Sequence, residues 1–375
     1  MNVVIVGDFC DNGRISNLIK SKNYATIFGN ITPIIKNSDF SIVNFEFPVV
    51  VDSGNPISKN GPCLKGHINS IEAIKSAGFN VCTLANNHIK DQGANCCINT
   101  MHLLEESGFN TVGVGENLKD AGKILYLRSE KEVVAIINCC ENEFSIALNN
   151  EAGANPLNPI QQYYKIQEAK QTADYIIVIV HGGHENYQLP SPRMKELYRF
   201  FIDAGADAVV NHHQHCYCGY EIYKNKPIFY GLGNFIFDWE GKRNSIWNEG
   251  FILNLKLDKA CVRYELIPYE QCNQTPTIRT LKADMSENFF KNISYLNSII
   301  EDDYKLQYAL NNWYNKTGSR HFGIFQPYID RITSGLFSRG VLPSLLSKKR
   351  ILLIYNYICC ESHLDELRYI VSKNK

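Results

Sequence analysis

The sequence predicts an α/β domain followed by a helical C-terminal region, and three observations predict it. Short apolar runs recur along the first 270 residues, as buried strands do, and amphipathic stretches suited to helices separate them. Several of these runs end in Asp, Glu, Asn or His, at the point where a strand gives way to a loop or helix. After about residue 270, helical patterns dominate through residues 285–316 and 349–374. The length of 375 residues suits one large α/β domain plus an appendage, or two domains.

Composition and charge exclude several classes of protein. Lys plus Arg equals Asp plus Glu at 38 each, so the chain has no bulk charge to attract nucleic acid or an anionic membrane, and we expect no nucleic-acid partner. No apolar run has the length of a membrane span; residues 351–360 come closest and include Asn356. A signal peptide requires a basic segment before its apolar run, and no basic segment precedes the short apolar run at the start of this sequence. The thirteen Cys lack regular spacing and favour free thiols in a reducing compartment, so we expect a cytoplasmic protein.

The first two expected strands each end in carboxylates or amides. Residues 3–7 form an apolar strand that leads into Asp8, a frequent place for a metal ligand, although a turn or helix cap would also use an Asp there. Residues 40–46 form the second strand, and their spacing puts Asn44 and Glu46 on one face. Because Glu46 stands between two Phe residues, it is poorly placed for solvation and needs a partner or a metal.

The following elements alternate as an α/β fold requires. Residues 51–66 predict a long loop across the sheet edge, in which Lys65 either meets an anion or is a solvated surface lysine. The expected helices are 68–77, 94–107, 160–173 and 192–204, and the expected strands are 79–84, 109–114, 131–138, 174–180, 208–210 and 227–230. Residues from about 139 to 160 predict a loop rich in Asn.

The strongest single motif follows the expected strand 79–84. There Asn86, Asn87, His88 and Asp91 come before Gly93, so polar ligand types again stand between a strand and a helix. An ordinary Asn-rich turn would explain the same residues. The recurrence of this arrangement at other strand ends favours a functional site.

Two later strands deliver histidines in the same way. The strand 174–180 ends in His181, with His184 and Glu185 close behind, and the strand 208–210 leads into the sequence Asn-His-His-Gln-His of residues 211–215. Three imidazoles within four residues favour metal ligation over structural roles. A single structural zinc is an alternative, with ligands His213, His215, Cys216 and Cys218. Gly231 and Gly233 allow backbone to approach a bound group closely.

Together these strand ends supply the ligands of a two-metal site. The residues concerned are Asp8, Glu46, Asn87, His88, His181, His213 and His215. Two divalent ions carry four positive charges, and Asp8 and Glu46 neutralise only two of them. The site should therefore attract an anion, of which phosphate is the natural candidate.

The ordered motifs resemble those of the CapA family, which is named for poly-γ-glutamate capsule synthesis. They are Gly7-Asp8, Asn44-Phe45-Glu46, Ala85-Asn86-Asn87-His88 with Asp91 and Gly93, His181-Gly182-Gly183-His184-Glu185, His212-His213-Gln214-His215 and Leu232-Gly233-Asn234-Phe235. The resemblance covers roughly residues 1–240 and implies a calcineurin-like metallophosphatase fold, which is a four-layer αββα sandwich. We accordingly expect a CapA-like metallophosphatase domain over 1–270 and a helical region over 271–375.

The resemblance also implies roles for individual residues. Two divalent metal ions (Mn, Fe, Zn or Mg) would be held by Asp8, Glu46, Asn87, His181, His213 and His215. His88 would remain free beside them. The other polar residues of the motifs are expected to contact substrate, namely Asn44, Asn86, His184, Glu185, His212 and Asn234. Metallophosphatases usually carry a His two residues after the first Asp, where this chain has Cys10.

Two functions follow from these expectations. In the first, a hydroxide between the metals attacks the phosphorus of a phosphoester or phosphoanhydride while His88 protonates the leaving oxygen. Asp91 would then orient His88, or would instead cap a helix. In the second, the site binds or processes a polyanionic or peptide chain within a capsule-synthesis assembly with little or no phosphatase activity. The amphipathic helices after residue 270 would dock on the catalytic domain or on a partner.

Overall fold

The protein divides into two compact units, Met1–Leu306 and Gln307–Lys375. The structure, a computed structural model, describes residues 1–375 except 60, 259–260, 360–362, 365–366, 368–370 and 372–375. Strand β16 and helix α9, bounded below, belong to the first unit although they follow residue 270. The domain division after residue 270 therefore remains a proposal from the sequence.

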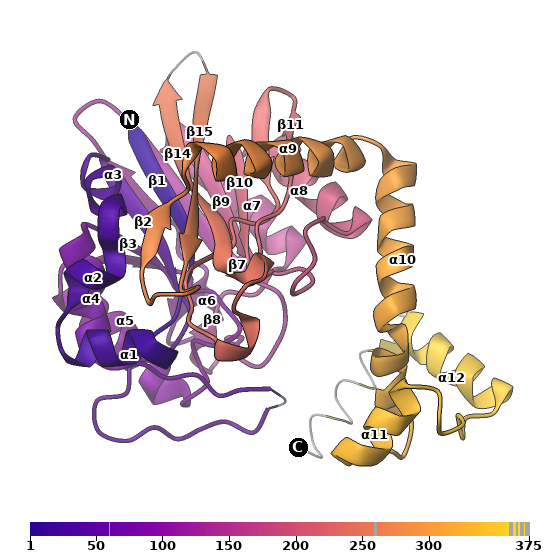
Figure 1. The fold of residues 1–375 in the computed structure, drawn as a ribbon. Helices are drawn as coiled ribbons and strands as arrows, with labels where there is room; N and C mark the ends of the chain where they lie inside the picture. Colours follow the sequence, from indigo (N-terminus) through magenta and orange to yellow (C-terminus); the bar gives the residue numbers. More distant parts are fainter. Residues whose placement is uncertain (60, 259–260, 360–362, 365–366, 368–370, 372–375) are drawn as a thin grey trace. The chain divides into compact units, whose positions relative to one another are not determined.

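Two mixed β-sheets form the centre of the first unit (Figure 1). In the described part of the chain, the first has the order β16-β15-β14-β1-β2-β3-β4, with β13 also paired to β1. Its strands are β1 (Asn2–Phe9), β2 (Phe40–Phe45), β3 (Val81–Thr83), β4 (Asn110–Val112), β13 (Asn234–Ile236), β14 (Glu249–Asp258), β15 (Cys261–Gln271) and β16 (Ile278–Thr280). The second has the order β11-β12-β10-β9-β7-β6. Its strands are β6 (Leu125–Arg128), β7 (Val133–Cys140), β9 (Tyr175–His181), β10 (Ala208–His212), β11 (Tyr220–Tyr223) and β12 (Lys226–Phe229).

Helices cover the outer faces of both sheets, as Figure 1 shows. The first sheet is covered by α1 (Gly13–Lys20), α2 (Tyr24–Phe28), α3 (Thr32–Lys36), α4 (Asn69–Ala77) and α5 (Ala94–Glu106). The second is covered by α7 (Pro159–Ala169) and α8 (Pro192–Ala204). Aromatic rings join the inner faces, since Phe229 lies 6.3 Å from Phe251 and 5.4 Å from Tyr264 between ring centroids. This layering confirms the predicted four-layer αββα sandwich.

Smaller elements complete the first unit. They are α6 (Leu118–Ala121), α9 (Ala283–Ile300), the 3-10 helices η1 (Gly29–Ile31), η2 (Glu240–Lys242) and η3 (Ile246–Asn248), and the short pair β5 (Val114–Gly115) and β8 (Gly153–Ala154). Helix α10 (Asp303–Phe322) begins here and continues into the second unit.

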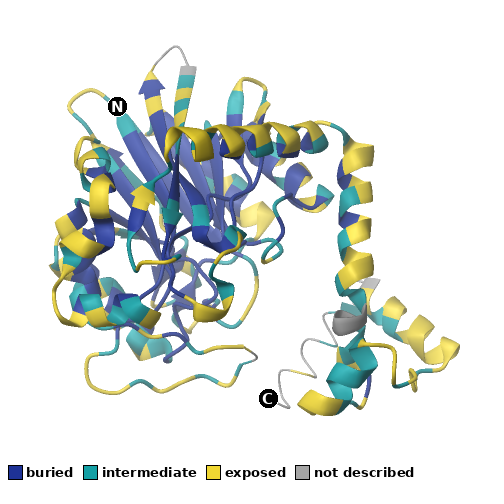
Figure 2. Ribbon diagram, viewed as in Figure 1, coloured by how far each residue is buried: buried dark blue, intermediate teal, exposed yellow. Residues whose placement is uncertain are grey.

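The predicted helix boundaries agree with the capping chemistry. The side chain of Ser191 accepts a hydrogen bond from the backbone of Met194 at 3.2 Å and caps α8, and Gly205 ends that helix with φ of 125°. Gly78 ends α4 with φ of 105°. Burial follows the pleat and the helix faces: the central strands are dark blue throughout in Figure 2, whereas the outer helices alternate in colour.

One predicted strand is wrong in its extent. Residues 109–114 do not form a single strand, because Gly113 turns the backbone between β4 and β5 with φ of 98°. A side chain at Gly113 would lie 2.1 Å from the amide oxygen of Asn138 and 2.7 Å from Ala85, so only glycine fits this close passage.

The second unit contains η4 (Gly323–Phe325), α11 (Arg331–Ser338) and α12 (Lys348–Cys359). Helix α12 accounts for the first part of the predicted helix 349–374, and residues 360–362, 365–366, 368–370 and 372–374 of that prediction lie outside the described residues. Among the residues that the structure describes, no helix combines the length and the apolarity needed to cross a membrane.

Candidate metal centre

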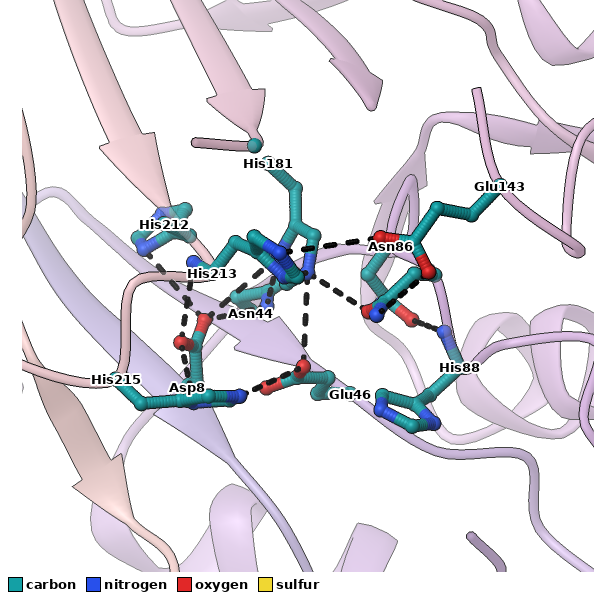
Figure 3. Close-up of polar contacts among 12 residues, drawn as sticks. Asp8, Asn44, Glu46, Asn86, His88, Glu143, His181, His212, His213 and His215 are labelled. Atoms are coloured by element: carbon teal, nitrogen blue, oxygen red, sulfur yellow. Dashed lines mark hydrogen bonds and ion pairs between the residues drawn. The ribbon is translucent and has the colours of Figure 1, made fainter. Parts of the chain in front are cut away.

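The residues predicted to bind metal converge at the carboxyl ends of parallel strands from both sheets (Figure 3). Asp8 lies near the end of β1, Glu46 follows β2, His181 ends β9, and His213 and His215 follow β10. Asn87 comes from the loop after β3. Since β1 pairs with β2 and β9 with β10, the sheet hydrogen bonds fix the positions from which these side chains extend.

Glu46 lies at the centre of the cluster. Its side chain is fully buried, and within the described residues neither of its carboxylate oxygens has a hydrogen-bond partner. Two groups of possible metal ligands include it, Asp8-Glu46-His215 and Glu46-His181-His213, each with ligand atoms within 4.8 Å of one another. A buried carboxylate without partners is costly, and a shared divalent cation would satisfy both oxygens. The donor set therefore fits divalent metal binding, with Glu46 common to two of the possible ligand groups.

His215 is oriented by Asn234. Its Nδ1 lies 2.8 Å from the amide oxygen of Asn234 and 3.4 Å from a carboxylate oxygen of Asp8. The Asn234 amide nitrogen also donates to the backbone oxygens of His215 and Trp247. The Nε2 of His215 faces Glu46 at 3.9 Å. A hydrogen bond at one ring nitrogen typically leaves the other available to a metal.

His181 is held by amides on both sides. Its Nδ1 lies 3.2 Å from the amide nitrogen of Asn44, which also donates to Asp8 at 2.7 Å. Its Nε2 lies 3.0 Å from the amide oxygen of Asn87 and 3.1 Å from the Nδ1 of His213. The Asn44 amide thus links the orientation of His181 to that of Asp8.

The backbone of the histidine loop adopts an unusual conformation. His213 has φ of 89° and His215 has φ of 56°, in the left-handed region that few residues other than glycine adopt. Such residues cost on the order of 1–3 kcal/mol each and cluster at functional sites. The loop also directs the backbone N–H of His213 towards Asp8 at 3.3 Å. The strain is consistent with a loop shaped to place two imidazoles beside Asp8 and Glu46.

Burial and neighbouring charges set the protonation states. Burial would raise the pKa of Asp8, but its hydrogen bond with His215 and the other surrounding histidines outweigh burial and hold that pKa well below its usual value. Burial, together with the charges of Asp8 and Glu185, raises the pKa of Glu46 well above its usual value. Burial lowers the pKa of His181 well below the ordinary value, and the charge of His213 lowers it further. Neutral imidazoles are the form that binds metal.

His88 and Asp91 form a second pair at the edge of the cluster. The Nδ1 of His88 lies 2.6 Å from a carboxylate oxygen of Asp91, whose other oxygen accepts from the ammonium group of Lys59 at 2.6 Å. Asp91 also accepts from the backbone N–H of Leu64 at 2.7 Å. Helix α5 is capped by Gly93 and receives no side-chain cap. The arrangement favours the orienting role of Asp91 over helix capping.

Three of the residues predicted to contact substrate are turned inward. Asn44 and Asn234 are fully buried and hold Asp8, His181 and His215 as described above. Asn86 is also fully buried; its amide donates to the backbone oxygen of Phe45 and accepts from the backbone N–H of His88. These positions fit the support of the ligand cluster better than contact with substrate.

The other three predicted substrate residues lie at different depths. Glu185 is exposed and forms a third possible ligand group with His213 and His215. His184 is half-buried, with its ring 6.2 Å from that of Tyr187. His212 is buried, with Nδ1 3.8 Å from Asp8, and has no hydrogen-bond partner at either ring nitrogen among the residues described. Of the three, Glu185 alone is exposed.

The cysteines near the cluster take no part in the ligand groups of the described residues. Cys216 and Cys218 are buried, and the Cys218 thiol donates to the backbone oxygens of Tyr187 and Cys216. The structural zinc alternative therefore finds no support. Burial raises the pKa of the Cys10 thiol well above its usual value, and the charge of Glu46 raises it further, so without a cation Cys10 remains a thiol.

Two polar residues at the site were not predicted. Lys59 belongs to the loop between residues 51 and 66, and Glu143 accepts from the Asn87 amide at 3.3 Å and lies 3.9 Å from the Nε2 of His213. Lys59 does not follow a strand, so the strand-end pattern gave no signal for it. Glu143 does lie three residues after β7, but it falls in the segment that was predicted only as an Asn-rich loop. The prediction had named Lys65 in the same loop as Lys59, and Lys65 is exposed.

Gly233 takes part in a close approach between two backbone segments. A side chain at Gly7 would lie 1.7 Å from the backbone oxygen of Gly233, so the close approach is between β1 and the segment before β13. Gly233 also has φ of 83°. The paired strands place Asp8 opposite Asn234, and the approach of Gly231 and Gly233 to a bound group stays a prediction.

Comparisons with known proteins identify the family. The family model described as "Bacterial capsule synthesis protein PGA_cap" matches residues 2–239. The chain is 33% identical to the capsule biosynthesis protein CapA of Bacillus anthracis over 255 residues, which cover 65% of this chain and 62% of that protein. It is 30% identical to the PGA biosynthesis protein CapA of Bacillus subtilis over 282 residues, which cover 74% and 73%.

Solved structures align with the chain at low similarity. A crystal structure of a novel phosphatase from Mycoplasma pneumoniae aligns with a TM-score of 0.44 and 14% identity, covering 73% of this chain and 95% of that one. A hypothetical protein from Thermus thermophilus aligns with a TM-score of 0.45, covering 75% and 100%. These likenesses are weak and assign no activity. The match over residues 2–239 shows that the chain belongs to the bacterial capsule synthesis protein family, PGA_cap.

Proposed function

We propose that the protein is a metal-dependent hydrolase of a phosphoester or phosphoanhydride. The observation that carries this proposal is Glu46, a buried carboxylate without hydrogen-bond partners in the described residues that is shared by two ligand groups. The ions would be held by Asp8, Glu46, Asn87, His181, His213 and His215. We infer two divalent ions of the Mn, Fe, Zn or Mg type, because the donors are carboxylate, amide and imidazole groups.

The charge of the site favours an anionic substrate. Among the proposed ligands only Asp8 and Glu46 are charged, since His and Asn are neutral, and they would compensate two of the four positive charges of two divalent ions. The neighbouring carboxylates of Glu143 and Glu185 would offset part of the remaining charge. When bound, such ions supply an activated water and Lewis-acid stabilisation of negative charge. A phosphoryl group carries its charge on oxygens that suit this environment.

His88 is proposed to give a proton to the departing oxygen. Its Nδ1 contacts Asp91 at 2.6 Å, which leaves Nε2 as the nitrogen that can act on substrate. The backbone N–H of His88 donates to the side chain of Asn86, whose amide donates to the backbone oxygen at the end of β2. Hydrogen bonds therefore fix both the backbone of His88 and, through Asp91, its imidazole ring. General acid catalysis requires such a positioned group within reach of the leaving oxygen.

Lys59 is proposed to hold the His88-Asp91 pair in place. Its side chain is almost fully buried, with the ammonium group 2.6 Å from Asp91, 3.3 Å from the Nδ1 of His88 and 5.8 Å from the ring centroid of Phe144. Because His88 and Lys59 contact different oxygens of Asp91, both interactions coexist. The loop between residues 51 and 66 would thus contribute directly to the alignment of the general acid.

A second candidate function is suggested by the relatives. Those from Bacillus are named as capsule and PGA biosynthesis proteins. In that case the same site would bind or process a polyanionic chain with capsule-synthesis partners, with little or no phosphatase activity. The described cysteines are free thiols, which supports a reducing compartment, and we propose the cytosol.

Turnover of simple substrates separates the two candidates. Purified protein supplied with manganese should hydrolyse an aryl phosphate monoester or diester, and the activity should disappear with chelator and return with metal. Protein that binds metal and a poly-γ-glutamate chain but hydrolyses neither ester would support the second candidate.

A further inference from the structure

The charge of the chain is unevenly distributed between the two units. Residues 307–375 contain ten Lys and Arg but four Asp and Glu, a net charge of +6, although the whole chain is neutral. The 30 residues from 331 to 360 contain five Lys and Arg and no Asp or Glu. The whole chain has equal numbers of acidic and basic residues, but this segment is strongly basic. The expectation that the chain lacks the charge to attract an anionic membrane therefore does not apply to the second unit.

Helix α12 carries large apolar side chains on an exposed face. Ile351, Leu352, Tyr355 and Ile358 are all exposed, Leu352 by 68% and Tyr355 by 66%. Their spacing of i, i+1, i+4 and i+7 places them along one stripe of a helix. The helix begins with Lys348, Lys349 and Arg350.

The segment before α12 continues the same character. Val341 and Leu345 are exposed by 64% and 63%, and Ile332 in α11 is exposed by 73%. Arg331 and Arg339 flank α11. Exposed apolar side chains and cations thus recur along residues 331–358, which contain no Asp or Glu, and we call these exposed side chains together the 331–358 surface.

We propose that the 331–358 surface binds the face of an anionic lipid membrane. Apolar side chains enter the boundary between headgroups and acyl chains, and Lys and Arg attract anionic headgroups. The described part of α12 has 12 residues, fewer than a bilayer span needs, so it would lie in the interfacial plane. Nucleic acid would match the charge but not the exposed Leu, Ile and Val. The inference does not rest on the proposed phosphoesterase activity.

Vesicle sedimentation with the full chain tests this proposal. Vesicles of phosphatidylcholine alone are compared with vesicles that also contain phosphatidylglycerol, at low and high salt. The protein should sediment with the anionic vesicles at least tenfold more strongly than with the neutral ones, and high salt should weaken the binding because it screens the charges. Equal binding to both vesicles, or none to either, would overturn the proposal.

Variants test whether vesicle binding depends on the 331–358 surface or on the positive charge of the protein in general. Replacing Lys348, Lys349 and Arg350 by Gln, or Leu352→Asp alone, should each reduce vesicle binding at least fivefold without changing circular dichroism, since these side chains are exposed. The matched control replaces Lys22, Lys123 and Lys291 by Gln, three exposed lysines of the first unit, and should bind like the wild type. Unchanged binding in the first two variants, or association with an acidic protein in place of vesicles, would refute the membrane assignment.

Discussion

Glu46 Oε1 lies 3.5 Å from the Nε2 of His181 in a buried cluster. Neither carboxylate oxygen of Glu46 accepts a hydrogen bond from the described residues. A carboxylate and an imidazole at this separation can bind one cation between them. The second ligand group, with Asp8 and His215, shares the same carboxylate. The proposed chemistry depends on this shared position.

Glu46→Gln should remove metal binding while preserving the fold. Gln has nearly the same volume, and the raised pKa of Glu46 means that the metal-free site already favours an uncharged side chain. We expect the metal content to fall by more than half and the unfolding free energy of the metal-free protein to change by less than about 1 kcal/mol. Elemental analysis and urea unfolding measure the two. The control is Glu249→Gln, whose pKa is also raised by burial but which belongs to no ligand group in the described residues.

Metal binding should release a proton and weaken as the pH falls. The pKa of Glu46 is raised, so the metal-free protein holds a proton there that the cation must displace, whereas the lowered pKa of His181 leaves its imidazole already neutral. Affinity should therefore increase with pH until Glu46 ionises without metal. Calorimetric titration with manganese in buffers of different ionisation enthalpy counts the protons. Manganese binding to the wild type that releases no proton, or that does not strengthen as the pH rises, would contradict this account.

His88→Gln should reduce turnover strongly without loss of metal. His88 contacts Asp91 and belongs to no ligand group in the part of the chain described, so the ions would remain. Loss of a general acid reduces the rate by about 10²–10⁴-fold. Aryl phosphate hydrolysis and metal content are measured on the same sample, with the exposed His102→Gln as the control. Wild-type turnover in His88→Gln would show that another group protonates the leaving oxygen.

Lys59→Met should reduce turnover through misalignment of the His88-Asp91 pair. The variant keeps an apolar side chain beside Phe144 but removes the ammonium group that Asp91 contacts at 2.6 Å. We expect kcat to fall by about 10- to 100-fold, with metal content unchanged. Lys65→Met is the matched control, because Lys65 lies exposed in the same loop. Equal effects of the two substitutions would mean that the loop acts through its general charge.

Much of the site could be predicted because its ligands follow strands. Apolar runs identify strands, parallel strands bring their carboxyl ends to one edge, and Asp8, Glu46, His181, His213 and His215 all stand at such ends. The sandwich could be predicted only from the ordered motifs, since the alternation of strands and helices does not specify how many sheets form.

The remaining features depend on contacts that sequence patterns do not encode. Lys59 contacts Asp91, which lies 32 residues later in the sequence, from a loop whose sequence has no helix or strand periodicity. Asn44 and Asn234 were expected to contact substrate because they lie in the motifs, but the direction of an amide side chain depends on the neighbouring strands. The hairpin of β14 and β15 was not predicted either.

The metal content of protein purified without chelator tests the central claim most directly. Elemental analysis should find close to two divalent ions per chain in the wild type, with fewer than one in Glu46→Gln, because both ligand groups contain that carboxylate. A folded wild-type protein that holds no metal after incubation with manganese, iron, zinc or magnesium would contradict the two-metal site and the hydrolytic function proposed from it.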